Sequence, residues 1–141
     1  MQILALGECM AELSPAEKTG KFKLGFAGDT FNTAWYLARL CPNADVAFYT
    51  AVGTDPMSKQ MREAFVASGI EGKFVQTIQD KSVGLYLIAL DKGERSFSYW
   101  RGQSAAREMI NDPTNLITAV ESSDVVYFSG ITLAILDIEQ R

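Results

Sequence analysis

Short apolar runs alternate along this chain with segments that have the periodicity of amphipathic helices. The runs span residues 2–6, 46–52 and 125–128, and each ends at a glycine or at a Ser-Gly pair, as buried strands usually do. Between the first two runs, one helix face is marked by Phe31, Ala34, Trp35 and Ala38. Strands that alternate with helices predict an α/β fold, in which a central sheet of parallel type carries flanking helices.

Capping signals give the limits of these helices. Asp55 is a good N-cap, Pro56 suits the first helical position, and Gly69 suits a helix end. Gly28 and the Asp29-Thr30 pair are expected to supply a turn and an N-cap for a helix over residues 29–40. Further helices are predicted over residues 112–122 and from Asp137 onward, after an apolar run at residues 133–136.

Composition excludes several classes of function. The chain has 141 residues, of which 48% are hydrophobic, and a net charge of −4 that disfavours nucleic acid as a partner. It contains no histidine, which excludes histidine-based triads and imidazole zinc sites. Its longest apolar stretch, residues 85–90, is too short to span a membrane. Cys9 and Cys41 are expected to be reduced core thiols, which implies a cytoplasmic location.

One segment departs from the alternation of strands and helices. Residues 82–101 contain two strand-like runs around a turn at 91–94, which predicts an antiparallel hairpin. A turn centred on residues 92 and 93 places Tyr86 opposite Tyr99 and Gly84 opposite Arg101, with both tyrosines and the arginine on one face. Such a face suits a polyhydroxylated acid, because Arg binds carboxylates and tyrosine hydroxyls bind sugar oxygens. The alternative is that facing tyrosines only stabilise the sheet and that the arginine is solvated.

A second candidate site lies at residues 25–32. Glycines ahead of a helix let the backbone approach a ligand, and Asp29 and Asn32 lie one turn apart, so both could reach it. The alternative is an ordinary helix start, and the glycine spacing matches neither a dinucleotide fingerprint nor a P-loop. Glu8 and Glu12 could face a site at the end of the first strand, but solvated loop acids are expected there.

Several of these segments match a known pattern. They are Gly7-Glu8 with Met10 and Leu13, residues 25–34, residues 37–40 and residues 52–55, followed by residues 84–86, 93–95, 99–101, 129–131 and 133–136. Together they resemble the amino-terminal half of ribokinase-like (PfkB-type) carbohydrate kinases. The resemblance implies an incomplete ribokinase-like fold, in which residues 1–141 form the amino-terminal part of one domain and residues 82–101 form a lid hairpin.

The resemblance also implies a substrate and its ligands. The pieces at 84–86, 93–95 and 99–101 are similar to members of the family that phosphorylate a keto-deoxy sugar acid, 2-keto-3-deoxygluconate. Gly28, Asp29 and Asn32 would contact the hydroxyl groups of the sugar acid. Tyr86, Tyr99 and Arg101 would close over it from the lid, with Arg101 nearest the carboxylate.

The family uses ATP and Mg²⁺, with a catalytic aspartate in a Gly-Ala-Gly-Asp motif of the carboxyl-terminal half. The only Gly-Asp pair here is Gly28-Asp29, on the acceptor side. No catalytic residue, metal ligand or cofactor site is therefore predicted on this chain, and the chain alone is expected to be inactive. The alternatives are a fragment of a different sugar or nucleoside kinase of the family, a non-catalytic sugar-acid binding module, and a homo-oligomer formed through the lid.

Overall fold

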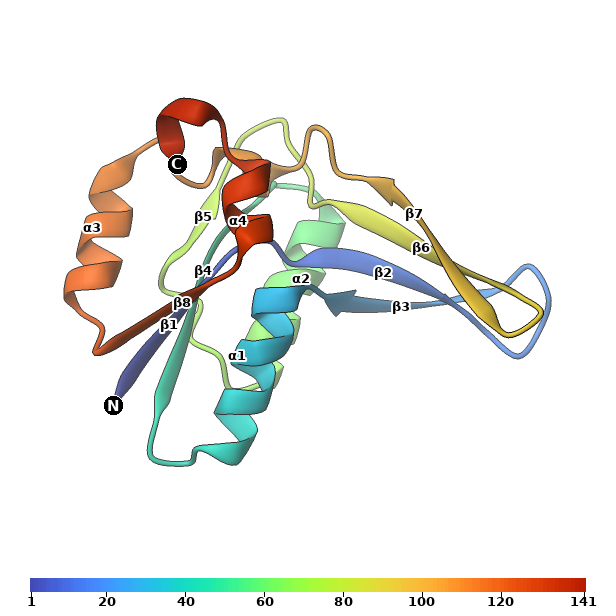
Figure 1. Cartoon of the computed structure of the whole chain (residues 1–141), viewed down its shortest axis with the longest axis horizontal. Helices are drawn as coiled ribbons and strands as arrows, with labels where there is room; N and C mark the ends of the chain where they lie inside the picture. The colour runs from blue at the N-terminus through green and yellow to red at the C-terminus, as the bar shows by residue number, and fades with distance from the viewer.

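The structure, a computed structural model, describes residues 1–141. The chain forms two β-sheets, and helices surround the first of them (Figure 1). The first sheet has the strand order β5-β4-β1-β8, and all its pairings are parallel. Its strands are β1 (Gln2–Leu6), β4 (Asp45–Val52), β5 (Val75–Thr77) and β8 (Val125–Phe128). The predicted α/β architecture is therefore confirmed.

Helices cover both faces of this sheet, because side chains of β4 alternate between two cores. Val46 and Phe48 belong to the core under α1 (Asp29–Leu40) and α2 (Pro56–Ala67). Ala47 and Tyr49 face the opposite core, formed with the 3₁₀ helix η1 (Ala105–Glu108), α3 (Pro113–Glu121) and α4 (Gly130–Ile135). A strand with apolar residues on both faces is typical of a parallel sheet buried between helices.

The helix ends agree in part with the sequence. Asp55 caps α2 as predicted, and its carboxylate accepts hydrogen bonds from the backbone N–H groups of Met57 and Ser58. The N-cap of α1 is Gly28, without any side-chain cap, so the predicted Asp29-Thr30 cap is wrong. The helix predicted from Asp137 is only the short 3₁₀ turn η2 (Ile138–Gln140), whereas the apolar run before it forms part of α4.

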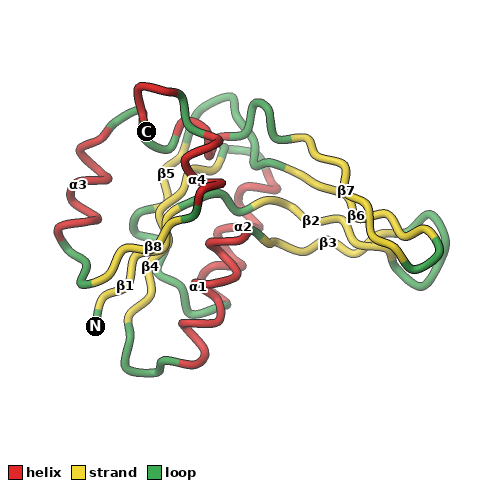
Figure 2. The backbone as a smooth tube through the Cα atoms, viewed as in Figure 1, coloured by secondary structure: helices red, strands yellow, loops and turns green.

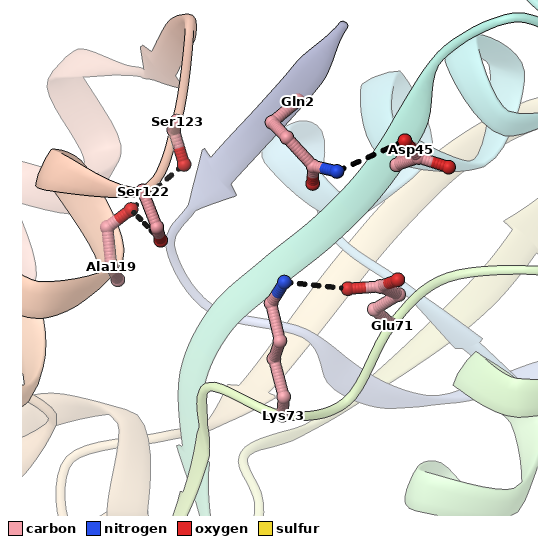
Figure 3. Close-up of polar contacts among 7 residues, drawn as sticks. All are labelled: Gln2, Asp45, Glu71, Lys73, Ala119, Ser122 and Ser123. Carbon is pink, nitrogen blue, oxygen red and sulfur yellow. Dashed lines mark hydrogen bonds and ion pairs between the residues drawn. The ribbon is translucent and has the colours of Figure 1, made fainter.

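Side-chain hydrogen bonds stabilise the ends of strands and of a helix at the central sheet (Figure 3). Gln2 Nε2 donates to Asp45 Oδ2 at 2.9 Å, which ties β1 to β4. The hydroxyls of Ser122 and Ser123 donate to the Ala119 carbonyl at 3.0 and 2.7 Å and close the end of α3 before β8. The adjacent β8 was expected to be buried, but Val125, Val126 and Phe128 are exposed because β8 is an edge strand.

The second sheet extends away from the helices (Figure 2). Its order is β3-β2-β6-β7, with β2 (Met10–Pro15), β3 (Phe22–Ala27), β6 (Leu85–Asp91) and β7 (Glu94–Trp100). The predicted hairpin register is confirmed for β6 and β7, where Tyr86 pairs with Tyr99 and Ile88 with Phe97. The sequence did not predict β2 and β3, so the hairpin is part of a larger mixed sheet.

The structure also bears on two expectations drawn from composition, one about the cysteines and one about membrane-spanning segments. Both cysteines are free, but only Cys9 is buried in the core, whereas Cys41 is half-buried at the end of α1. None of the helices has the length and apolar character needed to cross a bilayer.

Candidate functional site

A hollow of about 290 Å³ separates the start of α1 from the second sheet. It contains both groups of candidate residues that the sequence singled out, those at the helix start and those of the hairpin. Its lining residues are Glu8, Met10, Gly28, Asp29, Asn32, Tyr86, Phe97, Tyr99, Arg101 and Ile131. Such a hollow is at the lower end of the roughly 300–1,000 Å³ typical of ligand pockets, which suits a small molecule.

The first turn of α1 presents polar groups to this hollow. Asn32 Oδ1 lies 3.5 Å from the Gly28 N–H, which leaves the Asn32 amide NH₂ group available to a ligand oxygen. The Asp29 and Asn32 side chains are exposed on the same turn. The backbone also requires a glycine at residue 28, because a Cβ at this position would overlap the Glu8 carbonyl oxygen. The glycine therefore allows the helix start to approach the end of β1 closely.

Aromatic rings line the hairpin side of the hollow. The ring centroids of Tyr86 and Tyr99 lie 5.8 Å apart, and Phe97 stacks on Tyr99 at 6.2 Å. The Tyr86 hydroxyl donates to Glu12 Oε2. Burial, reinforced by this hydrogen bond, raises the pKa of Tyr86, so the hydroxyl stays protonated. Its oxygen can then accept a hydrogen bond from a ligand, while Tyr99 offers an exposed hydroxyl.

Two acids that were expected to be solvated take part in this arrangement. Glu12 lies within β2, next to Tyr86 on β6, and is half-buried. Glu8 is only 4% exposed and forms an ion pair with Arg101, through Glu8 Oε2 and Arg101 Nη2. The prediction of solvated loop acids is therefore wrong, because Glu12 lies in a strand beside Tyr86 and Glu8 is buried against Arg101.

Burial has an electrostatic consequence at Glu8. Loss of hydration raises the pKa of its carboxyl, although the Ser104 hydroxyl and the guanidinium groups of Arg101 and Arg107 act to lower it. Ser104 is itself buried next to this carboxyl group. The ionised Glu8 carboxylate is therefore stabilised by the polar and basic groups around it, including its ion-pair partner Arg101.

We expect this raised pKa to appear as a pH dependence of stability. The folded chain keeps the Glu8 proton to a higher pH than the unfolded chain, so unfolding between the two pKa values releases a proton. The contribution of Glu8 to the free energy of unfolding is then lost as pH rises from about 4.5 through the raised pKa. Urea unfolding of the parent and of Glu8→Gln across this range should show the parent losing stability relative to the variant. Parallel pH profiles would contradict this expectation.

A larger hollow lies beside this one. It has a volume of about 520 Å³, shares Arg101 and is lined otherwise by residues 80–83, 100 and 102–104. It receives no group from α1 and no tyrosine. The smaller hollow therefore has the chemistry for a polyhydroxylated ligand, with a guanidinium, an amide, a carboxylate and aromatic rings.

No cluster of three His, Cys, Asp or Glu side chains stands together in the chain. In the candidate hollow the acidic residues are Asp29 and Glu8, and Glu8 is engaged by Arg101. These residues do not fit a metal–nucleotide site.

Comparison with known proteins points to one family. A family model described as "pfkB family carbohydrate kinase" matches residues 1–139. A 2-dehydro-3-deoxygluconokinase of Haemophilus influenzae is 41% identical over 99% of this chain, and one of Escherichia coli K12 is 40% identical over the same share. The alignment covers 46% of each relative, so this chain spans about half their length.

Solved structures give the same fold. A 2-dehydro-3-deoxygluconokinase of Thermotoga maritima superposes with a TM-score of 0.85 at 21% identity, over 97% of this chain and 43% of that one. A PfkB family carbohydrate kinase of Listeria grayi superposes with a TM-score of 0.83 at 24% identity, over 96% and 43% of the two chains. The two sheets and their helices are therefore a partial ribokinase-like fold, as the sequence predicted.

Proposed function

This chain belongs to the pfkB family of carbohydrate kinases, and we propose that it carries the acceptor-binding part of a kinase for 2-keto-3-deoxygluconate. Residues 1–141 would be the amino-terminal part of one ribokinase-like domain, with residues 82–101 as its lid hairpin. The observation that carries the proposal is that the helix start and the hairpin line one hollow of about 290 Å³. The names of its 40–41% identical relatives support this choice of substrate.

The proposed binding mode follows from the chemistry of each lining group. Arg101 would bind the carboxylate of the sugar acid, because a guanidinium offers several N–H donors in a fork that matches two carboxylate oxygens. Asp29 would accept from sugar hydroxyls, and the Asn32 amide would donate to them. Tyr86 and Tyr99 would cover the apolar side of the carbon chain. The tyrosine–arginine pattern disfavours a neutral sugar or a nucleoside.

Isothermal titration calorimetry tests this proposal. The chain is expected to bind 2-keto-3-deoxygluconate saturably, with one site per chain, and to bind ribose and fructose at least about tenfold more weakly, since a neutral sugar lacks a partner for Arg101. Equal affinity for ribose would contradict the proposed substrate class. Absence of heat with every sugar would contradict a binding role altogether.

Transfer of phosphate requires parts that we assign to the rest of a longer protein. The family uses ATP and Mg²⁺. Phosphoryl transfer depends on holding the acceptor, the nucleotide and the metal together, with a group that positions the attacking hydroxyl. The residues of this chain supply the acceptor side only, so no step of the transfer is assigned to them.

A protein of these 141 residues alone is therefore expected to release no ADP from ATP in the presence of the sugar acid. A coupled assay for ADP, run with Mg²⁺ and with saturating sugar acid, measures this against a blank without protein. Release of ADP above the blank, abolished by Asp29→Asn but retained in Asp91→Asn, would show that the chain transfers phosphate and would overturn the assignment.

The exposed face of the second sheet supports a further proposal, that the chain pairs with a copy of itself through the lid. Phe22 and Leu24 of β3 and Trp100 of β7 are exposed, and strand alternation places all three on the face opposite the hollow. Sedimentation should then show a dimer that is weakened in Leu24→Lys. A parent chain that sediments only as a monomer would contradict this proposal.

A further inference from the structure

We propose that Glu8 is a positioning residue for Arg101, which holds the guanidinium at the wall of the hollow so that its free donors meet a ligand carboxylate. The proposal rests on the proposed function, in which this hollow takes a sugar acid. Glu8 follows β1, whereas Arg101 follows β7 at the base of the hairpin. The pair therefore joins the central sheet to the second sheet at the hollow.

Burial distinguishes this ion pair from the others. The side chains of Glu8 and Arg101 are 2% and 24% exposed, whereas those of Lys59 and Glu63 are 80% and 64% exposed. An exposed pair contributes little, but a buried charge that loses its partner is strongly unfavourable. Arg101 is consequently restrained in a way that a surface arginine is not.

The guanidinium divides its donors between the protein and the hollow. Arg101 Nη2 is buried and faces Glu8 Oε2, while the side chain as a whole is 24% exposed and lines the hollow. A guanidinium carries N–H donors on Nη1 and Nε as well. Because Nη2 is held by Glu8, these other donors are the ones available to a carboxylate.

Gly84 provides the space that this arrangement needs. A Cβ on residue 84 would lie 2.7 Å from Glu8 Oε1 and 3.2 Å from Arg101 Cβ. Such distances are too short for ordinary contacts, so any side chain at residue 84 would displace the carboxylate, the arginine or both. The room predicted beside the arginine is therefore used by both partners of the pair.

A positioning role makes a prediction that a purely structural role does not. If Glu8 only stabilised the fold, its loss would weaken all ligands alike. If Glu8 orients Arg101, its loss weakens a ligand with a carboxylate and spares an analogue whose carboxylate is blocked. The methyl ester of 2-keto-3-deoxygluconate is such an analogue.

Calorimetry with the acid and its methyl ester tests the proposal on Glu8→Leu and Glu8→Gln. Glu8→Leu is expected to lower the affinity for the acid about tenfold or more, with the ester changed less than about twofold, since an oriented charge-assisted hydrogen bond is lost. Glu8→Gln keeps an acceptor oxygen and is expected to retain most of the affinity for the acid. The exposed Glu94→Leu in the hairpin turn is the matched control.

Two results would overturn the positioning role. One is an equal loss of affinity for the acid and the ester in Glu8→Leu. The other is tighter binding of the acid in both Glu8 variants, which would mean that Glu8 opposes the ligand by its charge.

A measurement on the unsubstituted chain covers the case in which Glu8→Leu does not fold. Nitrogen-15 NMR of the arginine side chains, with Arg101 assigned from Arg101→Lys, should show separately resolved Nη signals because rotation of the guanidinium is hindered. Averaged Nη signals would overturn the proposal. If the parent binds neither acid nor ester, the proposed function fails, and this signal alone decides whether Glu8 holds Arg101.

Discussion

Replacing Arg101 by alanine is expected to weaken binding of 2-keto-3-deoxygluconate about a hundredfold. The change removes the only basic side chain of the hollow, and a charge-assisted hydrogen bond contributes roughly 1.5–3 kcal/mol, which corresponds to about 10- to 100-fold in affinity. It also leaves the buried Glu8 carboxylate without its partner. Titration calorimetry measures the affinity, and circular dichroism checks that the variant is folded.

Two further variants make this result specific. Arg95→Ala removes an exposed arginine from β7, the strand that Arg101 follows, and should leave the affinity unchanged. Arg101→Lys keeps the charge without the planar fork, so an intermediate affinity is expected. Arg101→Ala binding within about twofold of the parent would mean that the carboxylate is held elsewhere.

The largest expected effect on stability is that of Phe65→Ala. Phe65 is fully buried in α2, and its ring centroid lies 5.1 Å from that of Phe31 and 5.5 Å from that of Phe48. These rings join α1 and α2 to β4, so truncation leaves a cavity between three elements. A change of this kind lowers the free energy of unfolding by about 3–5 kcal/mol, a large share of the roughly 5–15 kcal/mol of a typical domain.

Urea unfolding followed by circular dichroism measures this loss. Val66→Ala is the matched control, because Val66 is the next residue on the same helix and is 72% exposed. The control should change the free energy of unfolding by less than about 0.5 kcal/mol. Equal effects of the two substitutions would mean that the Phe31–Phe48–Phe65 cluster does not stabilise the folded chain.

The local sequence pattern was sufficient to predict much of this fold. The apolar run of β4 and the Asp55-Pro56 start of α2 carry their own signals, in strand hydrophobicity and in capping chemistry. The β6–β7 register followed from one turn, because the position of a turn fixes every opposed pair of a hairpin. That register was sufficient to place Tyr86, Tyr99 and Arg101 on one face.

The missed features depend on contacts between distant segments. Strands β2 and β3 contain glycine, lysine and proline, and the antiparallel pairing that stabilises them forms only across the loop at residues 16–21. A charged residue such as Glu8 is solvated in most contexts, and nothing near it in the sequence indicates that Arg101 will cover it. Its position directly after β1, at the carboxyl end of a parallel strand, was the signal available.

The central claim is that the helix start and the hairpin hold one sugar acid between them, and an NMR titration tests it most directly. As 2-keto-3-deoxygluconate is added, the backbone amides of residues 28–32 and the side-chain signals of Arg101 are expected to shift along a single saturation curve. Shifts confined to one of these two segments, or no saturable shift in either, would contradict the claim.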